Sequence, residues 1–415
     1  MPLDHLTNLS DRQTFIKDLE TDLSLGKSLR LYRIEAIHLK AVNRKYGQKA
    51  GDRLLEVFAQ RMREWRPDFR VYRINPVTFV LISDGTEQPD AQELYDLLKE
   101  PVALNGETVI PKTRIICLNT EKGDSEHTVL DLFEYTAALR EMLICPVIEI
   151  GGEIRSAMNR VQYVNDEVLY AMEHETFTMV YQPVYDLKKK KYISAEALIR
   201  LFGRDGKFIS PGELIPLAEK RYYIDRITEI VIQKVCSFLG RNPDLDIDSV
   251  SVNLTPGQIT DEELPAKLQQ ITADCGIELS KLRLEMTERT IQQNPSQIAG
   301  IMHRLNEMGT GFYLDDFGTG YSNLSSVIAL PFEAIKFDRS LILSLGNEQN
   351  DRMIALLAEM MHIGHAKIIA EGVEEEWQVR YAEENKIDRI QGYYYSKPLN
   401  EEQFVQFIAV QNRKD

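Results

Sequence analysis

Acids, amides and a lysine stand at the ends of short apolar, β-prone stretches in the C-terminal part of the chain. These residues are Glu196, Asn253, Glu285, the neighbours Asp315 and Asp316, Lys336, Glu371 and Gln391. A buried strand tolerates a charged group at its end far better than in its middle. Polar ends on successive strands therefore predict one shared site where parallel strands converge, which in a (β/α)8 barrel is the C-terminal face. So many acids repel one another unless a cation lies among them, and a divalent metal ion is the simplest solution.

The side chains in this set offer carboxylate and amide oxygens, which suit Mg²⁺ or Mn²⁺. We expect one ion among Glu196, Asn253, Glu285 and Asp315. Asp315 would bridge to a second ion, held by Asp316 and, directly or through water, by Glu371. Two ions about 3.5–4 Å apart are the arrangement that cleaves phosphodiesters, because they activate a water and neutralise charge on the attacked phosphate. The residues therefore favour a two-metal phosphodiesterase.

The sequence leaves other interpretations of these residues open. The Asp315-Asp316 pair before a glycine is also a common turn, and Lys336 could pair with Asp338 on a solvated edge. In the two-metal interpretation, the amine of Lys336 holds the attacking water. Arg200 offers a guanidinium fork that suits phosphate, unless it is an ordinary surface arginine. Gln391 would contact a base edge or position a water.

The elements that position these residues can be read from the alternation of strand-like and helix-like segments. From about residue 178, eight strand candidates alternate with helices, as in a (β/α)8 barrel. The first 150 residues predict a compact α+β domain with an antiparallel sheet, including a hairpin that turns at Asn75 and Pro76. A charged amphipathic helix within 151–177 links the halves. We therefore expect an α/β protein with domains at 1–150 and 178–415.

Charge and hydropathy exclude two classes of partner. The formal net charge of −15 would repel a long nucleic acid, which needs a basic face. No apolar run reaches the roughly 18–20 residues of a membrane span. The start, MPLDHLTNLSDR, is too polar for a signal peptide. We expect a cytoplasmic protein with no membrane segment within this chain, and an upstream sensor or membrane segment is compatible with that expectation.

The motifs that contain the candidate residues resemble those of the EAL family of cyclic di-GMP phosphodiesterases. They are YQP at 181–183, EALIR at 196–200, PLAE at 216–219, VNLTP at 252–256, EMTE at 285–288, DDFGTGYSNLS at 315–325, IKFD at 335–338, AEGVE at 370–374 and QGYYYSKP at 391–398. The likeness extends from about residue 165 to the end. It implies a TIM-like barrel that opens cyclic di-GMP to linear pGpG with two Mg²⁺ or Mn²⁺ ions, and that commonly forms a homodimer near the DDFGTG loop.

Matched position by position, the resemblance also implies a role for each residue. The metal ligands would be Glu196, Asn253, Glu285, Asp315, Asp316 and Glu371, and the catalytic residues would be Glu196, Lys336 and Glu371. The substrate contacts would be Gln182, Leu198, Arg200 and Gln391, with Glu374 near the substrate. Glu288 would hold the DDFGTG loop. Leu201 departs from the usual tryptophan and Arg221-Tyr222-Tyr223 from a glycine-containing turn, but neither change removes a metal ligand.

The N-terminal half resembles a GGDEF domain, the diguanylate cyclase fold. The likeness lies in LTNLSDR at 6–12, LKAVNRKYGQKAGDRLL at 39–55 and VYRINPVTFVLI at 71–82. The eponymous motif has become NPVTF at 75–79, and Ile37 stands where an aspartate normally binds metal. A cyclase needs such acids for its ions, so we expect no synthesis from this degenerate domain. Asn43 and Asp52 match guanine-contacting positions, and a protein or nucleotide regulator could act there.

Three functions are consistent with this pattern. The first is an active, metal-dependent cyclic di-GMP phosphodiesterase with a regulatory GGDEF-like domain. The second is a catalytically silent cyclic di-GMP receptor that signals by conformational change. Silent relatives usually lack a metal ligand, whereas every expected ligand is present here, which favours the enzyme. The third is a scaffold that binds a protein through its N-terminal half, and it is compatible with either of the others.

Overall fold

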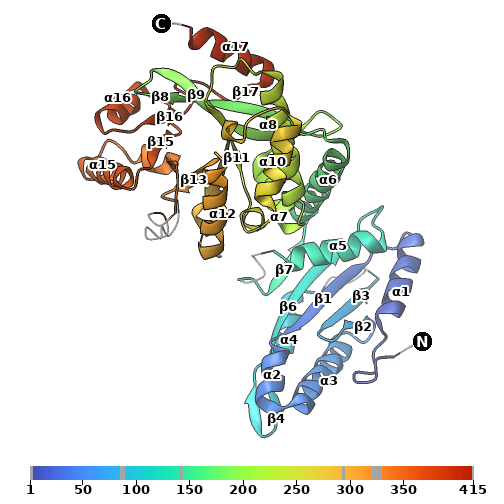
Figure 1. The fold of residues 1–415 in the computed structure, drawn as a ribbon. Helices are drawn as coiled ribbons and strands as arrows, with labels where there is room; N and C mark the ends of the chain where they lie inside the picture. The colour runs from blue at the N-terminus through green and yellow to red at the C-terminus, as the bar shows by residue number, and fades with distance from the viewer. Residues whose placement is uncertain are drawn as a thin grey trace. The chain divides into compact units, whose positions relative to one another are not determined.

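The computed structural model describes residues 3–84, 89–139, 144–291, 295–319, 327 and 330–413. Two compact units are present, residues 1–162 and 163–415 (Figure 1). The boundary between them falls inside helix α6 (Gly152–His174), the segment expected to link the halves. The part of the DDFGTGYSNLS motif after Thr319 lies outside the described residues.

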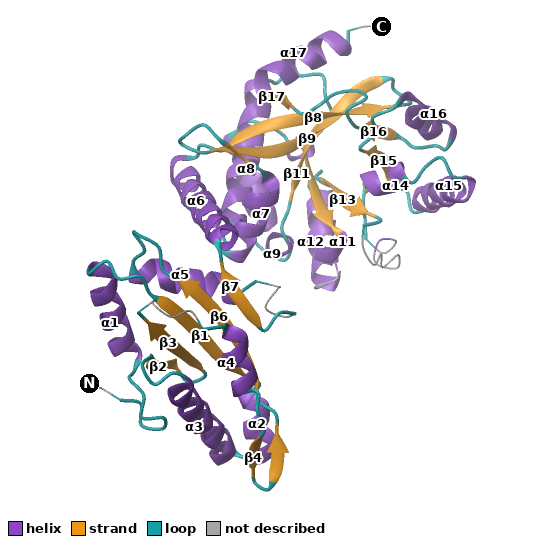
Figure 2. Cartoon of the chain, turned by 180° about the vertical axis from the view of Figure 1, so that it is seen from behind, coloured by secondary structure: helices purple, strands orange, loops and turns teal. Residues whose placement is uncertain are grey.

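The first unit is built on a five-stranded sheet in the order β2-β3-β1-β6-β7. Its strands are β1 (Arg30–Ile37), β2 (Arg70–Asn75), β3 (Thr78–Ser83), β6 (Lys112–Asn119) and β7 (Val147–Ile150), with a separate hairpin of β4 (Val102–Leu104) and β5 (Glu107–Val109). The helices are α1 (Arg12–Ser24), α2 (Leu39–Tyr46), α3 (Gln48–Trp65), α4 (Ala91–Leu98) and α5 (Glu126–Ala137). Helices α1 and α5 lie on one face of the sheet and α3 and α4 on the other (Figure 2). Phe15 and Phe133 belong to the core on the first face, and Phe58 and Leu94 belong to the core on the second.

Two details of this sheet differ from expectation. The β6–β7 pair is parallel, because helix α5 provides the crossover between them. The β2–β3 hairpin pairs Asn75 with Thr78, so Pro76 and Val77 form the turn, one residue later than expected. The side chain of Asn75 accepts the N–H of Val77 at 3.1 Å, which ends the strand after Asn75 instead of before it.

The second unit is a closed barrel, as expected. Eight strands of the described residues form its wall: β8 (Thr178–Asp186), β9 (Lys191–Phe202), β11 (Ser249–Asn253), β12 (Leu282–Thr287), β13 (Gly311–Phe317), β14 (Ala334–Phe337), β15 (Lys367–Glu371) and β16 (Arg389–Gln391). Seven of them, from β9 to β16, run parallel, and two short strands, β10 (Phe208–Ile209) and β17 (Leu399–Asn400), pair outside the wall.

Strand β8 departs from a regular (β/α)8 barrel because it runs antiparallel to both of its neighbours, β9 and β16. Only residues 187–190 connect β8 to β9. A parallel crossover needs a dozen or more residues, so this connection can form only a hairpin. Thr178 therefore pairs with Arg200, and the start of β8 lies at the end of the barrel where the other strands finish.

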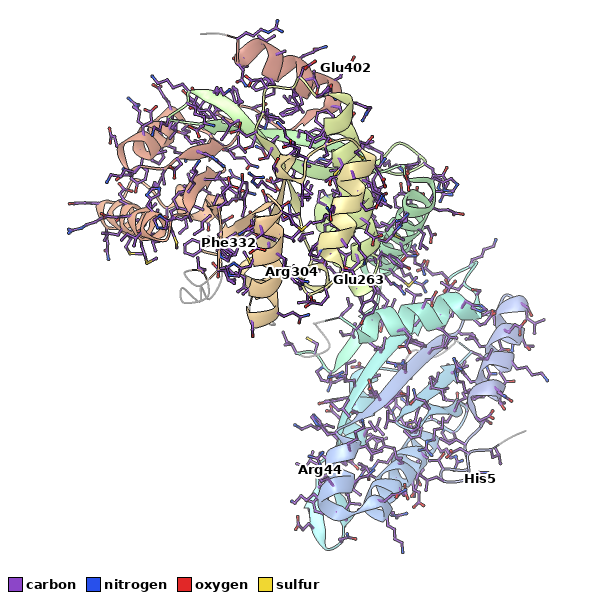
Figure 3. All side chains as sticks on the ribbon, viewed as in Figure 1. His5, Arg44, Glu263, Arg304, Phe332 and Glu402 are labelled. Atoms are coloured by element: carbon purple, nitrogen blue, oxygen red, sulfur yellow. The ribbon has the colours of Figure 1, made fainter. Side chains whose placement is uncertain are left out.

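Helices cover the outside of the barrel (Figure 2). They are α7 (Pro211–Lys220), α8 (Ile224–Arg241), α9 (Pro256–Ile259), α10 (Leu264–Asp274), the 3-10 turn η2 (Leu279–Lys281), α11 (Glu288–Ile291), α12 (Pro295–Glu307), α14 (Arg339–Leu343), α15 (Glu348–Ile363), α16 (Glu376–Glu384) and α17 (Glu401–Gln411). The outer surface carries charged side chains, among them Glu263, Arg304 and Glu402 (Figure 3). Among the described residues, no helix combines the length and the apolar character that crossing a bilayer would require.

Candidate active site

A buried lysine lies at the centre of the strand-end acids. The side chain of Lys336, on β14, is 1% exposed. Its Nζ lies 3.0 Å from Glu196, 2.7 Å from Glu285, 3.0 Å from Asp315 and 2.7 Å from Glu371. These carboxylates come from β9, β12, β13 and β15, so four different strands converge on one ammonium. The alternative that Lys336 pairs with Asp338 on a solvated edge is wrong.

Asp338 instead has a local role, since its carboxylate caps helix α14 by accepting the N–H of Ser340 at 2.8 Å. This carboxylate is close enough to Asp316 to contribute to raising the pKa of that group, after burial and Asp315. The acids at this end of the barrel therefore extend beyond the set that contacts Lys336.

The same acids form two groups whose ligand atoms could each surround a metal ion. Glu196, Glu285 and Asp315 form the first group, and Asp315, Asp316 and Glu371 form the second. Within each group the ligand atoms all lie within 4.8 Å of one another. Asp315 belongs to both, which is the arrangement that a bridging carboxylate requires. Because every donor is a carboxylate oxygen, the set fits a hard divalent cation such as Mg²⁺ or Mn²⁺.

Strand β13 presents two adjacent aspartates to one site through a local irregularity. Neighbouring side chains on a regular strand point to opposite faces. The pairing of β13 with β14 shifts register between Leu314 and Phe317, and Asp316 has a left-handed backbone with φ of 55°. This conformation is uncommon for a residue other than glycine. It accounts for the placement of Asp315 and Asp316 in one group, and Asp316 also begins a turn, because its carbonyl accepts the N–H of Thr319 at 3.3 Å.

The acids differ in their affinity for protons. Burial raises the pKa of Glu371 to about 8, and the charges of Asp315 and Glu196 add to that effect. Burial also raises the pKa of Glu285, reinforced by the charge of Glu196. The pKa of Glu196 is lowered, because Lys336 and hydrogen bonds outweigh the effect of burial. The single ammonium is therefore too little positive charge to keep every carboxylate ionised.

The amides of Gln391 and Asn253 bind the carboxylate of Glu196, and a third amide, that of Gln182, contacts Gln391. Gln391 donates to Glu196 Oε2 at 2.6 Å and Asn253 donates to Glu196 Oε1 at 3.1 Å. Gln391 also lies 3.3 Å from the Oε1 of Gln182, whose own amide donates to the carbonyl of Ser396 at 3.4 Å. Gln182 reaches the site from within β8, not from a strand end, because β8 runs in the opposite direction. The amides of Gln391 and Asn253 fix the orientation of Glu196.

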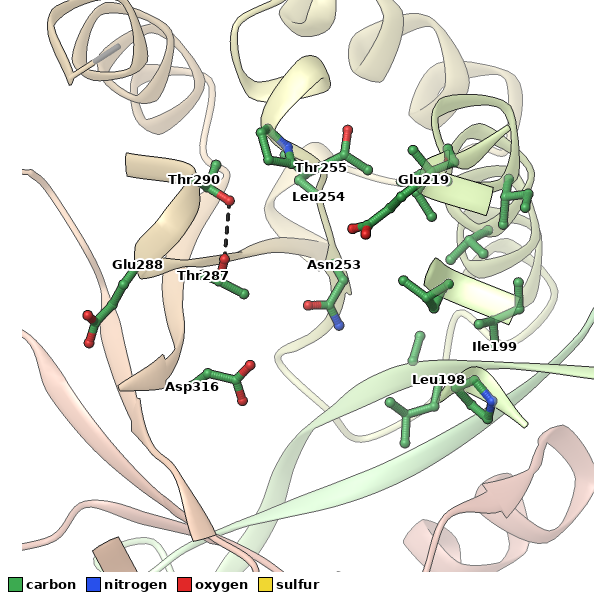
Figure 4. A pocket seen from close by; sticks show the side chains of 18 of the residues that line it. Leu198, Ile199, Glu219, Asn253, Leu254, Thr255, Thr287, Glu288, Thr290 and Asp316 are labelled. Atoms are coloured by element: carbon green, nitrogen blue, oxygen red, sulfur yellow. Dashed lines mark hydrogen bonds between the residues drawn. The ribbon is translucent and has the colours of Figure 1, made fainter. Parts of the chain in front are cut away.

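A cavity of about 870 Å³ opens beside the acids (Figure 4). Leu198 and Arg200 line it from β9, and Asn253 and Asp316 line it from the acid side. Arg200 donates to the carbonyl of Ile199 at 2.8 Å, and burial lowers the pKa of its guanidinium. Arg200 is therefore a partly buried cavity residue and not an ordinary surface arginine.

Two other expected residues occupy different places. The carboxylate of Glu288 accepts the N–H of Gly318 at 3.4 Å, so it contacts the start of the DDFGTG loop. Glu374 pairs with Arg339 at 3.0 Å and belongs to neither carboxylate group. The site thus unites the expected ligands and amides, while Glu374 stays partly exposed beside an arginine.

The structure adds cavity residues to which the sequence assigned no role. They are the apolar side chains of Pro211, Ile215, Ile224, Ile227, Val231, Leu254 and Pro256, and the polar side chains of Glu219, Thr228, Thr255, Thr287 and Thr290. Thr287 and Thr290 form a hydrogen bond at 3.3 Å (Figure 4). Glu219 lies in the PLAE motif, so its motif was visible in the sequence, but its direction into the cavity was not.

Comparisons with known proteins place this barrel in a family. The EAL domain family model matches residues 165–398, more than half of the chain. The chain belongs to the EAL family. The model "Diguanylate cyclase, GGDEF domain" matches residues 1–125, so the two domains occur in tandem with the EAL barrel second.

Curated relatives align with almost the whole chain. The "Cyclic di-GMP phosphodiesterase NbdA" of Pseudomonas aeruginosa is 30% identical over 412 residues, which are 95% of this chain and 52% of that protein. The "Bifunctional diguanylate cyclase/cyclic di-GMP phosphodiesterase MucR" of the same species is 29% identical over 427 residues, 98% of this chain and 61% of that protein. The chain spans about half the length of the first curated relatives that it matches.

Solved structures agree with the fold of the EAL barrel. The cyclic di-GMP complex of the PaMucR phosphodiesterase aligns with a TM-score of 0.54 and 29% identity, over 58% of this chain and 99% of that one. The Vibrio cholerae LapD structure, which contains an S helix, a GGDEF and an EAL domain, aligns with a TM-score of 0.51 over 94% of this chain and 95% of that one. At 19% identity, the second comparison shows the fold alone.

Proposed function

We propose that the EAL barrel is a metal-dependent phosphodiesterase that hydrolyses cyclic di-GMP to linear pGpG. The observation that carries this proposal is the carboxylate of Asp315, which two groups of acids share around the ammonium of Lys336. The five grouped carboxylates and this ammonium leave a formal charge of −4, which two divalent cations balance. The relatives named as cyclic di-GMP phosphodiesterases supply the substrate class.

We assign residues to the two ions from the chemistry of their donor atoms. Glu196, Asn253, Glu285 and Asp315 would hold the first, and Asp315, Asp316 and Glu371 would hold the second. When bound, two such ions would lower the pKa of the attacking water and neutralise charge on the phosphate.

Residues of the chain would supply the remaining catalytic and substrate-binding roles. In the reaction a water loses a proton and its oxygen bonds to one phosphorus, while one phosphate ester P–O bond breaks and the ribose oxygen that leaves takes up a proton, which opens the ring. Lys336, fixed by four carboxylates, would hold the water and stabilise the negative charge that develops. Arg200 would orient a phosphate at the cavity wall, and Gln391 would keep Glu196 in place.

The proposal is tested by incubating the full chain with cyclic di-GMP and Mn²⁺ and measuring pGpG by chromatography. Glu196→Gln keeps the shape of the side chain but removes a ligand charge, so the rate should fall at least about 100-fold, since the ions supply several kcal/mol of charge stabilisation. Glu402→Gln, on the exposed surface of α17, is the matched control and should keep the wild-type rate. Wild-type protein that binds cyclic di-GMP without turnover would instead be a receptor.

We also propose that the first unit does not synthesise cyclic di-GMP. Its NPVTF segment at 75–79 has Val77 and Thr78 at the positions of the two acids of the motif, and β1 ends at Ile37. Asn43 lies on α2 and Asp52 lies on α3, where a regulatory nucleotide could bind. The test uses the Glu196→Gln variant, which should not degrade any cyclic di-GMP that forms. Incubation of this variant with GTP and Mg²⁺ should yield no cyclic di-GMP. Accumulation of the product would refute this assignment.

A further inference from the structure

Helix α6 holds the turn that follows strand β9 through a buried carboxylate. Glu167, on α6, is 5% exposed. Its carboxylate accepts the backbone N–H of Arg204 at 2.9 Å, together with the Nε at 3.0 Å and the Nη2 at 2.9 Å of the same residue. One carboxylate thus binds both the backbone and the guanidinium of Arg204, a charge-assisted arrangement that fixes geometry as well as charge.

A second residue of α6 contacts the same turn. The hydroxyl of Tyr163 donates to Asp205 Oδ1 at 2.7 Å. A Cβ atom at Gly203 would lie 2.0 Å from this hydroxyl, so only glycine permits the approach. The guanidinium of Arg204 also lies over the ring of Tyr170, 5.0 Å from its centroid. We call Tyr163 and Glu167, with residues 203–205, the α6 clamp.

Few strand pairings hold the end of β9, although Leu201 packs into the barrel core. Strand β11 pairs with β9 only as far as Glu196, and β8 pairs with it only as far as Arg200. Beyond that point the two-residue strand β10 is its remaining partner strand among the described residues. Leu198 and Arg200 line the cavity from the stretch of β9 that pairs with β8 but no longer with β11. The turn after β9 therefore influences where these two side chains lie.

We propose that Glu167 is a positioning residue, through which α6 sets the place of Arg200 and so the affinity of the barrel for its cyclic dinucleotide. The inference rests on the function proposed above. Helix α6 also leads, after His174, into Thr178, the pairing partner of Arg200. It thus acts on β9 from both sides of Arg200. Arg200 is the group that would recognise a phosphate, so loss of the clamp should weaken substrate binding.

The clamp gives α6 a means of regulating the barrel. Met158, near the start of α6, is part of the core of the first unit, whereas Val164, Val168 and Ala171 are part of the core of the barrel. A movement of α6 along or about its axis would change the contacts of Glu167 with Arg204. Such a change at α6 would alter substrate affinity without any change at the metal ligands.

The metal centre should be insensitive to this change. Lys336, Glu285, Asp315 and Glu371 lie on strands that α6 does not clamp, and amides fix Glu196 independently. Disruption of the clamp should therefore raise KM and leave kcat close to the wild-type value. A purely structural defect would lower the amount of folded enzyme and so reduce the apparent kcat instead.

The test compares Glu167→Gln with Glu173→Gln in the full chain. Glu173 lies on the same helix with a side chain 78% exposed, so it is the matched control. With Glu167→Gln, KM for cyclic di-GMP should rise about tenfold, since misplacing a positioning group by about 1 Å can cost as much as 100-fold. The kcat value should change less than about twofold, and Glu173→Gln should change neither constant. Arg204→Gln should raise KM similarly, and the double variant should be no worse than either single variant.

A second readout is independent of turnover. Hydrogen exchange of the amides at 197–203 should be faster in Glu167→Gln than in wild type, while exchange at 249–253 should not change. Tyr163→Phe, which removes only the hydroxyl, replaces Glu167→Gln if the latter does not fold. If the wild-type protein turns over cyclic di-GMP and Glu167→Gln has the same KM, the proposed role of the clamp is overturned. Wild-type protein without turnover would refute the proposed function. The clamp would then be tested by hydrogen exchange alone, and unchanged exchange at 197–203 in Glu167→Gln would refute it.

Discussion

Lys336 is a fully buried ammonium whose charge is balanced by the carboxylates around it. A buried cation is tolerated only when it is paired and hydrogen-bonded, and four carboxylates satisfy that condition here. The carboxylates outweigh the effect of burial and keep the pKa of Lys336 above its usual value. Lys336 is thus charged at neutral pH and cannot serve as a base. Its expected roles are to hold a water and to stabilise negative charge.

Replacement of Lys336 by methionine should affect both stability and rate. With chelator present, loss of the ammonium leaves the carboxylates without a counter-ion, and breaking a buried ion pair costs about 3–5 kcal/mol. The melting temperature should therefore fall, and Mn²⁺ should raise it more in this variant than in wild type. The kcat value should also fall, because the group next to the reacting phosphate is lost. Calorimetry with and without Mn²⁺ measures the first effect.

The control for this experiment is Lys191→Met. Lys191 makes a surface pair with Asp246 at 3.1 Å, and such pairs contribute about 0–1 kcal/mol. Its melting temperature and kcat should stay near wild type. A Lys336→Met protein with wild-type stability in chelator would contradict the role of Lys336 as the internal counter-ion.

The sequence predicted the members of the site better than their contacts. Strand-end acids are visible as residue types, and their convergence follows from the barrel. The contact of one lysine with four of them depends on side-chain packing, which the sequence does not encode locally. The pairing of Glu374 with Arg339 was missed for the same reason, because Glu374 lies in the loop after β15 and Arg339 begins helix α14.

At the scale of elements, close backbone packing holds the loops after β15 and β16 together. A Cβ atom at Gly392 would lie 2.1 Å from the carbonyl oxygen of Val373 and 2.5 Å from its nitrogen. Gln391 precedes this glycine and Glu371 lies two residues before Val373. The absence of a side chain at Gly392 therefore allows the two loops to bring Gln391 and Glu371 to the site.

Gly392→Ala should force these loops apart and reduce both metal affinity and kcat. The backbone cannot yield as a flexible side chain would, so we expect destabilisation of about 1–3 kcal/mol, typical of overpacking. Gly300→Ala on α12 is the control, since a Cβ there meets nothing within 4 Å and alanine favours a helix. Urea unfolding and Mn²⁺ titration measure the two effects. A Gly392→Ala protein as stable as Gly300→Ala would contradict the packing argument.

Most elements were predictable because apolar periodicity and turn residues mark them. The direction of β8 was missed, although its signal is present: four residues between two strands cannot contain a crossover. The bulge in β13 had no such signal. It depends on the register with β14, which emerges only when the barrel closes.

At the scale of the whole molecule, helix α15 presents an apolar stripe to the solvent. Met353, Leu356 and Ile363 are 54%, 56% and 77% exposed, and Met360 lies between them on the same face. In an antiparallel pair of α15 helices, the spacing would place Met353 opposite Ile363 and Leu356 opposite Met360. A stripe that matches itself in this way suits a two-fold symmetric interface, so we expect the EAL barrel to form a homodimer.

Leu356→Glu should disrupt that dimer by placing a charge at its centre. Sedimentation at several concentrations should show a dimer for wild type and a monomer for the variant. Glu402→Gln, on the exposed surface of α17 and therefore outside the α15 stripe, is the control and should remain dimeric. A wild-type chain that stays monomeric at all concentrations would refute the interface.

The division into two halves could be predicted from motifs alone, since each half carries its own set. Their junction could not be predicted so sharply. A helical pattern shows that 152–174 is a helix, but not which core each turn of it joins. That assignment depends on long-range packing of Met158 and Val164, which no local pattern reveals.

The reversal of β8 has a consequence for how such proteins can be assembled. In a barrel of parallel strands alone, the first strand begins at the end opposite the chemistry, so anything fused upstream is attached far from the substrate. Here Thr178 begins β8 beside Arg200, and the chain therefore enters the barrel at its catalytic rim. Any module placed before α6 is therefore connected through α6 to this rim and not to the opposite end of the barrel. Upstream modules could then be exchanged while the connection to the catalytic end is preserved.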